Sequence, residues 1–315
     1  MGRETGQVSP VTLVLLTATL LYFTWRDLQL YISVQSWSCT TNSSVSLSVK
    51  YLLQPPTIHY VELPLSEMLE RRLCLSYFVS PNFVSVTGVV LGHISALLIS
   101  RGGRLPVLGV MTYKLRDLGD SLDGVLARGL GSAMVIVCAL MTLNRLSYHP
   151  QVPTPGTKGY YFDGWCDILS EALLIYSVAH LIHRERSKQH LVSAMSRPSL
   201  LSKLCAPLRW EIWSLGLQGI LSAVAWNWTT EQLHFILEAN NSVSPTQLAA
   251  PKAWMVVFLW RLLNPHMLTQ ALLVSLLLER PTQWVEMAKY VVSLPLLCLC
   301  AYSYLLVYTL KIEHK

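Results

Sequence analysis

Long runs of hydrophobic residues, separated by shorter polar or basic stretches, are the dominant pattern along the chain. A run of about twenty apolar residues is long enough to cross the hydrocarbon core of a bilayer as one helix. Segments that approach this length lie at residues 10–33, 83–100, 104–127, 163–183, 210–226, 253–278 and 286–310. The pattern therefore predicts an all-α integral membrane protein with seven spans.

The first of these segments has a short apolar core, from Val11 to Phe23. It fits either a cleaved signal peptide or an uncleaved signal anchor. We favour the anchor because Trp25 and Tyr31 extend the apolar stretch toward spanning length. Residues 34–80 are more polar and are expected outside the membrane, with amphipathic helices around Leu63–Leu75. This predicts an N-terminal part, 1–80, and a membrane domain, 81–315.

Two other segments are unusual for membrane spans. Segment 104–127 carries Lys114, Arg116 and three aspartates in its C-terminal half. Charged residues are tolerated in a span where they face a wet cavity lined by protein. Segment 131–143 is apolar but short, so it is interpreted as re-entrant or interfacial, and a full span stays open.

Composition agrees with a membrane protein. The chain is 52% hydrophobic and 13% charged, whereas soluble domains have about 25% charged residues. The formal net charge is +6, but Lys and Arg lie mainly in the loops between spans. Because they form no basic surface interleaved with aromatic residues, a nucleic-acid partner is not expected.

Aspartates are rare and clustered. Five of the six lie between residues 117 and 167. Asp120 and Asp123 are three apart, and Asp163 and Asp167 are four apart, so each pair shares one face of a helix. Two such pairs facing each other would hold four carboxylates in an apolar protein, which is costly unless a cation neutralises them. Oxygen ligands favour Mg²⁺ or Mn²⁺.

The spacing around these aspartates is specific. It reads Asp120-x-x-Asp123-Gly124-x-x-Ala127-Arg128, then Gly159-x-x-x-Asp163-x-x-x-Asp167. This resembles the signature of the CDP-alcohol phosphotransferases, membrane enzymes that move a phospho-alcohol from a CDP carrier to a hydroxyl. Pro81-Asn82, which opens a hydrophobic segment, is similar to a further family motif, although Ser85 stands where Thr is expected. The connection 129–158 is longer than the family normally has.

The resemblance implies the roles of the motif residues. Asp120, Asp123, Asp163 and Asp167 would hold Mn²⁺ or Mg²⁺, and Asp167 would also act as the general base. The CDP group would be bound by Asn82, Asp120, Gly124, Ala127, Arg128 and Gly159. Six spans would form the family core, with one N-terminal span added, and a homodimer is an expectation of the same resemblance.

Other polar residues are less specific. Asp117 is expected to be a solvated helix residue. Arg261, Asn264 and His266 are unusual in an apolar stretch. They would either have a functional role, by lining the catalytic cavity or binding lipid phosphate, or pair helices structurally.

Charge and glycosylation motifs together predict the orientation. The loop 183–209 is rich in Lys and Arg, which are typical of cytosolic loops, so the aspartate motifs would face the lumen. The three N-glycosylation sequons, at Asn42, Asn227 and Asn240, all fall in segments assigned to the lumen. Cys39 and Cys74 would lie in the same oxidising compartment and could form a disulfide; Cys74 as a buried thiol stays open.

The luminal site and the long connection resemble the sphingolipid branch of the family, in the Golgi membrane. Its members transfer phosphoethanolamine from CDP-ethanolamine to ceramide. Two alternatives stay open. One is an ethanolamine- or cholinephosphotransferase acting on diacylglycerol, which predicts a cytosolic motif and unused sequons. The other is a non-catalytic scaffold or transporter, against which the intact motif argues.

Overall fold

The structure is a computed structural model that describes residues 9–37, 52–131, 158–193, 208–236 and 250–313. Every regular element within these ranges is helical, so the predicted all-α fold is confirmed for them. By length and composition, four stretches can cross a membrane: Pro10–Gln35, Pro81–Arg101, Phe162–Ser187 and Pro281–Ile312. The chain is therefore a multi-pass membrane protein, and the count of seven spans stays a prediction.

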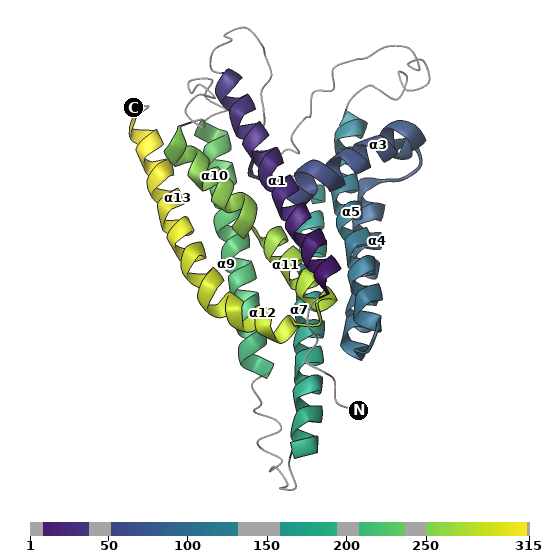
Figure 1. Ribbon diagram of the computed structural model, residues 1–315. Helices are drawn as coiled ribbons and strands as arrows, with labels where there is room; N and C mark the ends of the chain where they lie inside the picture. Colours follow the sequence, from purple (N-terminus) through teal and green to yellow (C-terminus); the bar gives the residue numbers. More distant parts are fainter. Residues whose placement is uncertain (1–8, 38–51, 132–157, 194–207, 237–249, 314–315) are drawn as a thin grey trace. The chain divides into compact units, whose positions relative to one another are not determined.

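The chain forms two compact units (Figure 1). Unit 1 comprises Met1–Pro56, Ser222–Met267 and Leu294–Lys315. Unit 2 comprises Thr57–Leu221 and Leu268–Ser293, and it contains the whole aspartate motif. The predicted boundary at residue 80 stays a prediction.

Unit 2 begins with a short helical segment ahead of its long helices. A π-helical turn, η1 (Ile58–Glu62), leads into α3 (Leu63–Leu73), which confirms the helix expected around Leu63–Leu75. The chain leaves α3 through Cys74, whose φ of 47° is left-handed, and passes a 3₁₀ turn, η2 (Leu75–Tyr77). The Ser66 hydroxyl donates to the carbonyl of Leu118, at 3.4 Å. Leu118 belongs to the long helix α5 (Leu105–Gly131).

Helices α4 (Pro81–Arg101) and α5 (Leu105–Gly131) form an antiparallel hairpin (Figure 1). Pro81 occupies the first helical turn of α4, and the Ser80 hydroxyl accepts from the Phe83 amide at 3.3 Å, capping the helix. The turn uses Gly102 and Gly103, whose positive φ angles (67° and 69°) favour glycine. At Gly109 a Cβ atom would lie 2.6 Å from Ile99 Cγ1, so the glycine lets the two helices pack closely.

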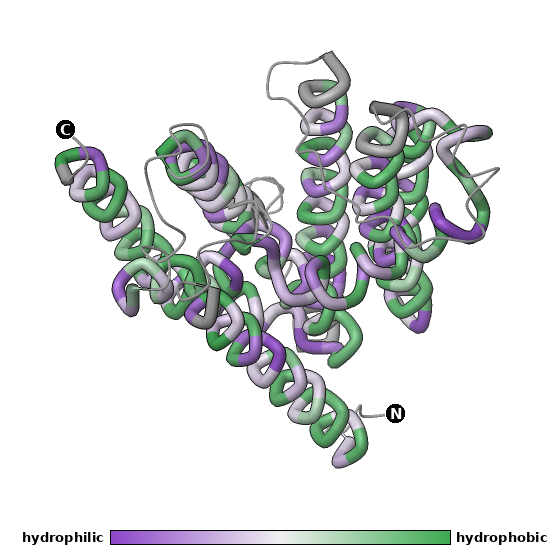
Figure 2. The backbone as a smooth tube through the Cα atoms, turned by 90° about the horizontal axis from the view of Figure 1, so that it is seen from above, coloured by the Kyte–Doolittle hydropathy of each residue, from purple (hydrophilic) through white to green (hydrophobic). Residues whose placement is uncertain are grey.

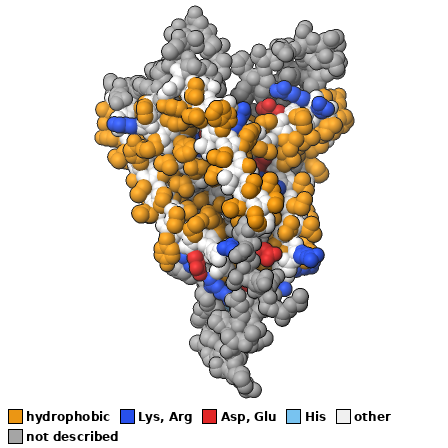
Figure 3. Space-filling view, in the orientation of Figure 1, with side chains coloured by type: hydrophobic (Ala, Val, Ile, Leu, Met, Phe, Trp, Pro, Cys, Tyr) orange, Lys and Arg blue, Asp and Glu red, His pale blue; other side chains and the backbone are white. Residues whose placement is uncertain are grey.

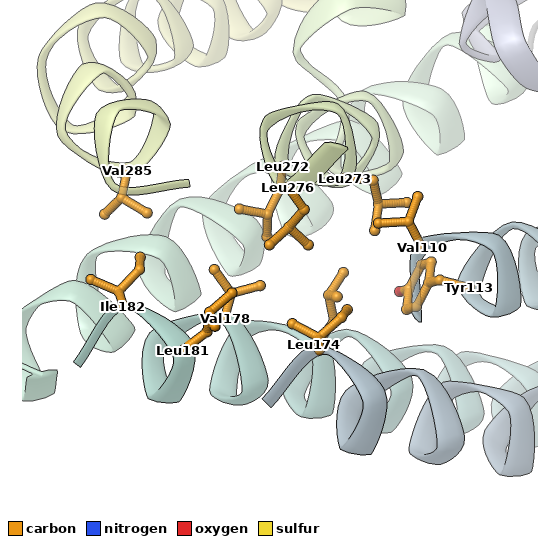
Figure 4. Packing of buried hydrophobic residues seen from close by; sticks show 11 residues of the cluster. Val110, Tyr113, Leu174, Val178, Leu181, Ile182, Leu272, Leu273, Leu276 and Val285 are labelled. Atoms are coloured by element: carbon orange, nitrogen blue, oxygen red, sulfur yellow. The ribbon is translucent and has the colours of Figure 1, made fainter. Parts of the chain in front are cut away.

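Helix α7 (Lys158–Ser193) packs against α4 and carries the second half of the motif. A hydrophobic cluster fixes its other side (Figure 4). Leu174, Val178, Leu181 and Ile182 of α7 lie opposite Leu272, Leu273 and Leu276 of α11 (Pro265–Leu277), with Val110 and Tyr113 of α5 beside them. Close packing of these side chains holds α5 and α7 together, because van der Waals contact between helices stabilises a membrane protein.

Unit 1 contains α1 (Pro10–Trp37), α10 (Pro251–Leu263) and most of α13 (Ser293–Glu313). Arg261 of α10 is fully buried and binds both carboxylate oxygens of Asp27 of α1, at 2.7 and 3.2 Å. Its Nη1 donates to the Leu52 carbonyl at 2.8 Å. Arg261 therefore pairs helices, which decides between the two roles left open for it.

Segment 253–278 is not one continuous helix, contrary to the prediction. It divides into α10 and α11 at Asn264, which has an extended backbone with φ −66° and ψ 160°. The following Pro265 excludes the helical conformation at Asn264 and lacks an N–H donor. The Asn264 Oδ1 atom accepts from the Met267 amide at 2.8 Å, so this side chain caps α11. The role of His266 stays open.

Two helices are longer than predicted. Helix α9 (Leu208–His234) continues beyond residue 226, and α7 continues into the basic segment 183–209 as far as Ser193. In α9 the hydroxyls of Thr229 and Thr230 donate to the carbonyls of Ala225 and Trp226 at 2.8 Å. These polar side chains are satisfied within the helix, and residues 227–234 contain neither glycine nor proline.

Hydrophobic side chains cover much of the described surface on the face drawn in Figure 3, and hydrophobic residues recur along the helices (Figure 2). On α1 the exposed side chains include Val11, Leu13, Val14, Leu15, Leu20, Leu21 and Trp25. A water-soluble monomer rarely exposes continuous apolar patches of this kind. The surface therefore agrees with a protein whose helices face lipid.

Candidate active site

The four motif aspartates line one pocket in unit 2, between α4, α5 and α7. The pocket is small, with a cavity volume of about 10 Å³. Its lining comes from Val84, Ser85, Gly88 and Val89 of α4, from Arg116, Asp120 and Asp123 of α5, and from Asp163, Cys166, Asp167 and Ser170 of α7. The expectation that the two aspartate pairs face each other is confirmed.

The carboxylates are close enough to share a cation. Oxygen atoms of Asp120, Asp163 and Asp167 all lie within 4.8 Å of one another. Asp123 is 5% exposed, and its Oδ2 accepts from the Ser85 hydroxyl at 2.8 Å. The donor set consists of oxygen atoms, as Mg²⁺ and Mn²⁺ prefer. The residues therefore fit a divalent ion, and their role as its ligands stays a prediction.

Electrostatics also favours a cation here. Four carboxylates lie in a pocket whose other lining residues are apolar or neutral, apart from Arg116. Like charges in apolar surroundings raise the energy of the charged state, and one guanidinium cannot compensate for four of them. A divalent ion would supply the missing positive charge.

Arg116 is a charged residue of the pocket that the motif does not contain. Its side chain is 4% exposed, and its Nη2 donates to Asp167 Oδ1. Its Nη1 donates to Asp117 Oδ1 at 3.3 Å, and its guanidinium carbon lies 5.6 Å from the centre of the Tyr113 ring. The sequence offered one signal for this contact, since Arg116 precedes Asp120 by one helical turn and so lies on the same face of α5.

Asp117 is completely buried, so the expectation of a solvated residue was wrong. Its carboxylate accepts from Lys114 Nζ at 3.1 Å and from Gln270 Nε2 at 2.8 Å. Lys114 Nζ also donates to Glu62 Oε1 at 2.6 Å and to Gln270 Oε1 at 2.9 Å. A buried carboxylate needs such partners, and one of them, Gln270 of α11, is distant in sequence.

Ser85 is the second residue that sequence reasoning undervalued. It was noted only as a departure from an expected Thr, yet it is buried and binds Asp123. Its position one turn after Pro81 places its hydroxyl on the inner face of α4, where Thr would also reach.

Of the residues predicted to bind the CDP group, Asp120 lines the pocket, whereas Asn82, Gly124 and Ala127 do not contribute to its lining. Asn82 is an exposed residue of the first turn of α4, and Gly124 and Ala127 follow Asp123 on α5. Arg128 lies on α5 and Gly159 on α7, but the Arg128 side chain is outside the described part of the chain. Their contacts with a nucleotide stay predictions.

Several other predicted residues lie outside the described ranges. These are Cys39, Asn42 and Asn240, together with most of segment 131–143. The Cys39–Cys74 disulfide therefore stays a prediction. Asn227 is described: it is exposed on α9.

Comparison with known proteins identifies the family. A family model described as "Ceramide phosphoethanolamine synthase" matches residues 34–309, which is most of the chain. The chain belongs to the ceramide phosphoethanolamine synthase family. These synthases are enzymes of the CDP-alcohol phosphotransferase type, as the aspartate motif predicted. The match includes residues 34–80 as well as the membrane domain.

A curated relative supports the assignment to the synthase family. It is "Ceramide phosphoethanolamine synthase" from Drosophila melanogaster, 27% identical over 286 residues. The aligned region covers 83% of this chain and 69% of the relative. No solved structure matches the chain.

Proposed function

We propose that the chain transfers phosphoethanolamine from CDP-ethanolamine to the primary hydroxyl of ceramide, giving ceramide phosphoethanolamine and CMP. The observation that carries the proposal is the pocket in which Asp120, Asp163 and Asp167 place carboxylate oxygens within 4.8 Å of one another. The family, whose name states this product, supports the choice of substrates.

The residues divide into two tasks. Asp120, Asp123, Asp163 and Asp167 hold the cation, with Ser85 fixing one oxygen of Asp123. Bound Mn²⁺ or Mg²⁺ would neutralise the charge that develops on the phosphate oxygens. Asn82, Gly124, Ala127, Arg128 and Gly159 contact the CDP group, Arg128 through a charge-assisted fork.

Asp167 acts as the general base. It accepts the proton of the ceramide hydroxyl while that oxygen bonds to the β-phosphorus of the donor. The bond between the β-phosphorus and the bridging oxygen breaks, and CMP leaves with the electron pair. Asp167 lies at the edge of the pocket, with its side chain 39% exposed, so an acceptor hydroxyl can approach it.

The proposal includes the membrane setting. The protein crosses the Golgi membrane seven times, with the pocket facing the lumen. The basic segment 183–209 and the placement of the sequons support this orientation.

The substrates are tested with purified full-length protein in detergent with Mn²⁺. CDP-ethanolamine and CDP-choline are each offered with ceramide and with diacylglycerol, and the lipid product and CMP are quantified. We expect product from CDP-ethanolamine with ceramide. Product from diacylglycerol alone would refute the acceptor assignment, and no product from any pair would favour a non-catalytic role.

The same assay tests the metal and the base. Chelation with EDTA should abolish activity, and added Mn²⁺ should restore it. Asp167→Asn keeps the shape of the side chain but cannot take a proton, so kcat should fall by about 100-fold or more. Glu286→Gln, which neutralises an exposed acid of α12 (Pro281–Met287), is the matched control and should leave activity unchanged. Full activity of Asp167→Asn would exclude the base.

A further inference from the structure

A chain of ionic contacts, buried at Glu62, Asp117 and Arg116, runs from η1 to the candidate base. Glu62 binds Lys114, Lys114 binds Asp117, Asp117 binds Arg116, and Arg116 binds Asp167. Gln270 contacts both Lys114 and Asp117 at 2.9 and 2.8 Å. All these residues belong to unit 2. Arg116 is the member that joins the network to the pocket.

The geometry at Arg116 is that of a fixed side chain. One guanidinium nitrogen contacts Asp117 and the other contacts Asp167, while Tyr113 lies beside the guanidinium. Arginine is planar and offers donors in a rigid fork, so two anchored nitrogens define the plane of the group. Asp167 itself is only partly buried. Its orientation therefore depends on a partner that cannot move.

From this geometry we infer that Arg116 is a positioning residue for Asp167, and that Asp117 holds Arg116 in place. The inference rests on the proposed function, because it assigns Arg116 to the base of that reaction. Arg116 also balances one carboxylate charge of the pocket. In this assignment Arg116 acts through Asp167, to which its Nη2 donates, while its Nη1 donates to Asp117.

The inference predicts opposite effects on turnover and on metal binding. In Arg116→Gln the base loses its fixed orientation, and kcat should fall by about 100-fold, the order expected when a reacting group is displaced by about 1 Å. The KM for CDP-ethanolamine should stay close to that of the wild type. Mn²⁺ should bind at least as tightly as in the wild type, because a positive charge next to its ligands has been removed.

Mn²⁺ binding is measured by electron paramagnetic resonance, which needs no turnover. Arg116→Lys should recover part of the lost kcat, since an ammonium can hold Asp167 but cannot span both carboxylates. Asp117→Asn should lower kcat by a smaller factor than Arg116→Gln while leaving the Mn²⁺ affinity unchanged. Arg186→Gln removes an ion pair with Glu286 at 3.4 Å on the same unit and is the matched arginine control.

Each result separates the inference from its alternatives. A raised KM for CDP-ethanolamine with unchanged kcat would show that Arg116 binds the donor, which overturns the positioning role. If Arg116→Gln and Arg116→Lys both lose kcat to the same extent, and both also lose Mn²⁺ binding, Arg116 has a purely structural role. If the wild type is active only with another substrate pair, the proposed substrates are wrong, and the same variants are compared on that pair.

If the wild type is inactive with every pair, the resonance spectrum of bound Mn²⁺ still tests the contact. Arg116→Gln should then change the spectrum, because Asp167 becomes free to reorient at the metal. An unchanged spectrum would overturn the inference.

Discussion

Ser85 shows how one hydroxyl would prepare the proposed metal site. It donates to one oxygen of Asp123 at 2.8 Å, and both side chains are buried. The hydrogen bond fixes the carboxylate and leaves its other oxygen for a cation. Removing a group that orients a metal ligand in this way commonly lowers metal affinity or activity by about 10- to 100-fold.

Replacing Ser85 by alanine should therefore weaken metal activation. We expect Ser85→Ala to raise the Mn²⁺ concentration needed for half-maximal activity by about tenfold. Ser85→Thr, which keeps the hydroxyl, should behave like the wild type. Thr87→Ala is the control, because Thr87 is exposed on the same helix and donates only to the Phe83 carbonyl. Normal Mn²⁺ dependence in Ser85→Ala would contradict this role.

At this scale the sequence predicts what depends on local spacing. Helical periodicity places Asp120 and Asp123 on one face of α5, and Asp163 and Asp167 on one face of α7. The burial of Asp117 does not follow from periodicity, because it depends on Gln270, 153 positions away. A single sequence contains no signal that links such residues.

At the scale of elements, α1 and α10 are joined by a buried ion pair. Arg261 is 0% exposed and makes three hydrogen bonds, two to Asp27 and one to the Leu52 carbonyl. Removing one member of a buried pair leaves the other charge without compensation and costs more than the pair contributes. The pair therefore makes α1 part of the folded body of unit 1.

Asp27→Ala should lower the free energy of unfolding by about 3–5 kcal/mol, because Arg261 then stays buried without its carboxylate. The measurement is the midpoint of thermal unfolding in detergent, followed by tryptophan fluorescence. The double variant Asp27→Leu with Arg261→Met should recover most of the loss. Arg26→Ala, which removes an exposed neighbour on α1, should change little. Equal midpoints for Asp27→Ala and the wild type would argue against the pairing.

The helices themselves were largely predictable, and their ends were not. Hydrophobic runs located α1, α4, α5, α7 and α13. The division at Asn264 was missed, although Pro265 is a strong local signal, because the apolar run continues on both sides of it. The end of α9 was placed too early because Thr229 and Thr230 look like loop residues until their hydroxyls bond within the helix.

At the scale of the whole molecule, orientation in the membrane decides which substrates can reach the pocket. A luminal pocket must receive its nucleotide donor from the lumen, whereas a cytosolic pocket draws on the cytosol. Sequence supplies charge bias and sequons for this question. The order in which hydrophobic segments cross the bilayer fixes the answer, and segment 131–143 changes it if it spans.

Glycosylation tests the orientation. In cells, treatment with an endoglycosidase should shift the mobility of the wild type, and Asn42→Gln and Asn240→Gln should each remove one part of the shift. Asn227 should carry the least glycan, because Thr229 of its sequon is buried and bonded within α9. Asn144→Gln, outside any sequon, is the control. No shift in any form of the protein would contradict the luminal assignment.

The pairing of Asp27 with Arg261 also has a consequence for biogenesis. The two residues are 234 positions apart, and synthesis at about 5–20 residues per second separates their appearance by about 10–50 s. During this interval α1 is already made while the partner of its carboxylate does not exist. A charge in an apolar helix is costly in lipid, so we expect α1 to remain beside the insertion machinery until α10 emerges. Unit 1 is thus completed late, after the hairpin that carries the first aspartate pair has formed.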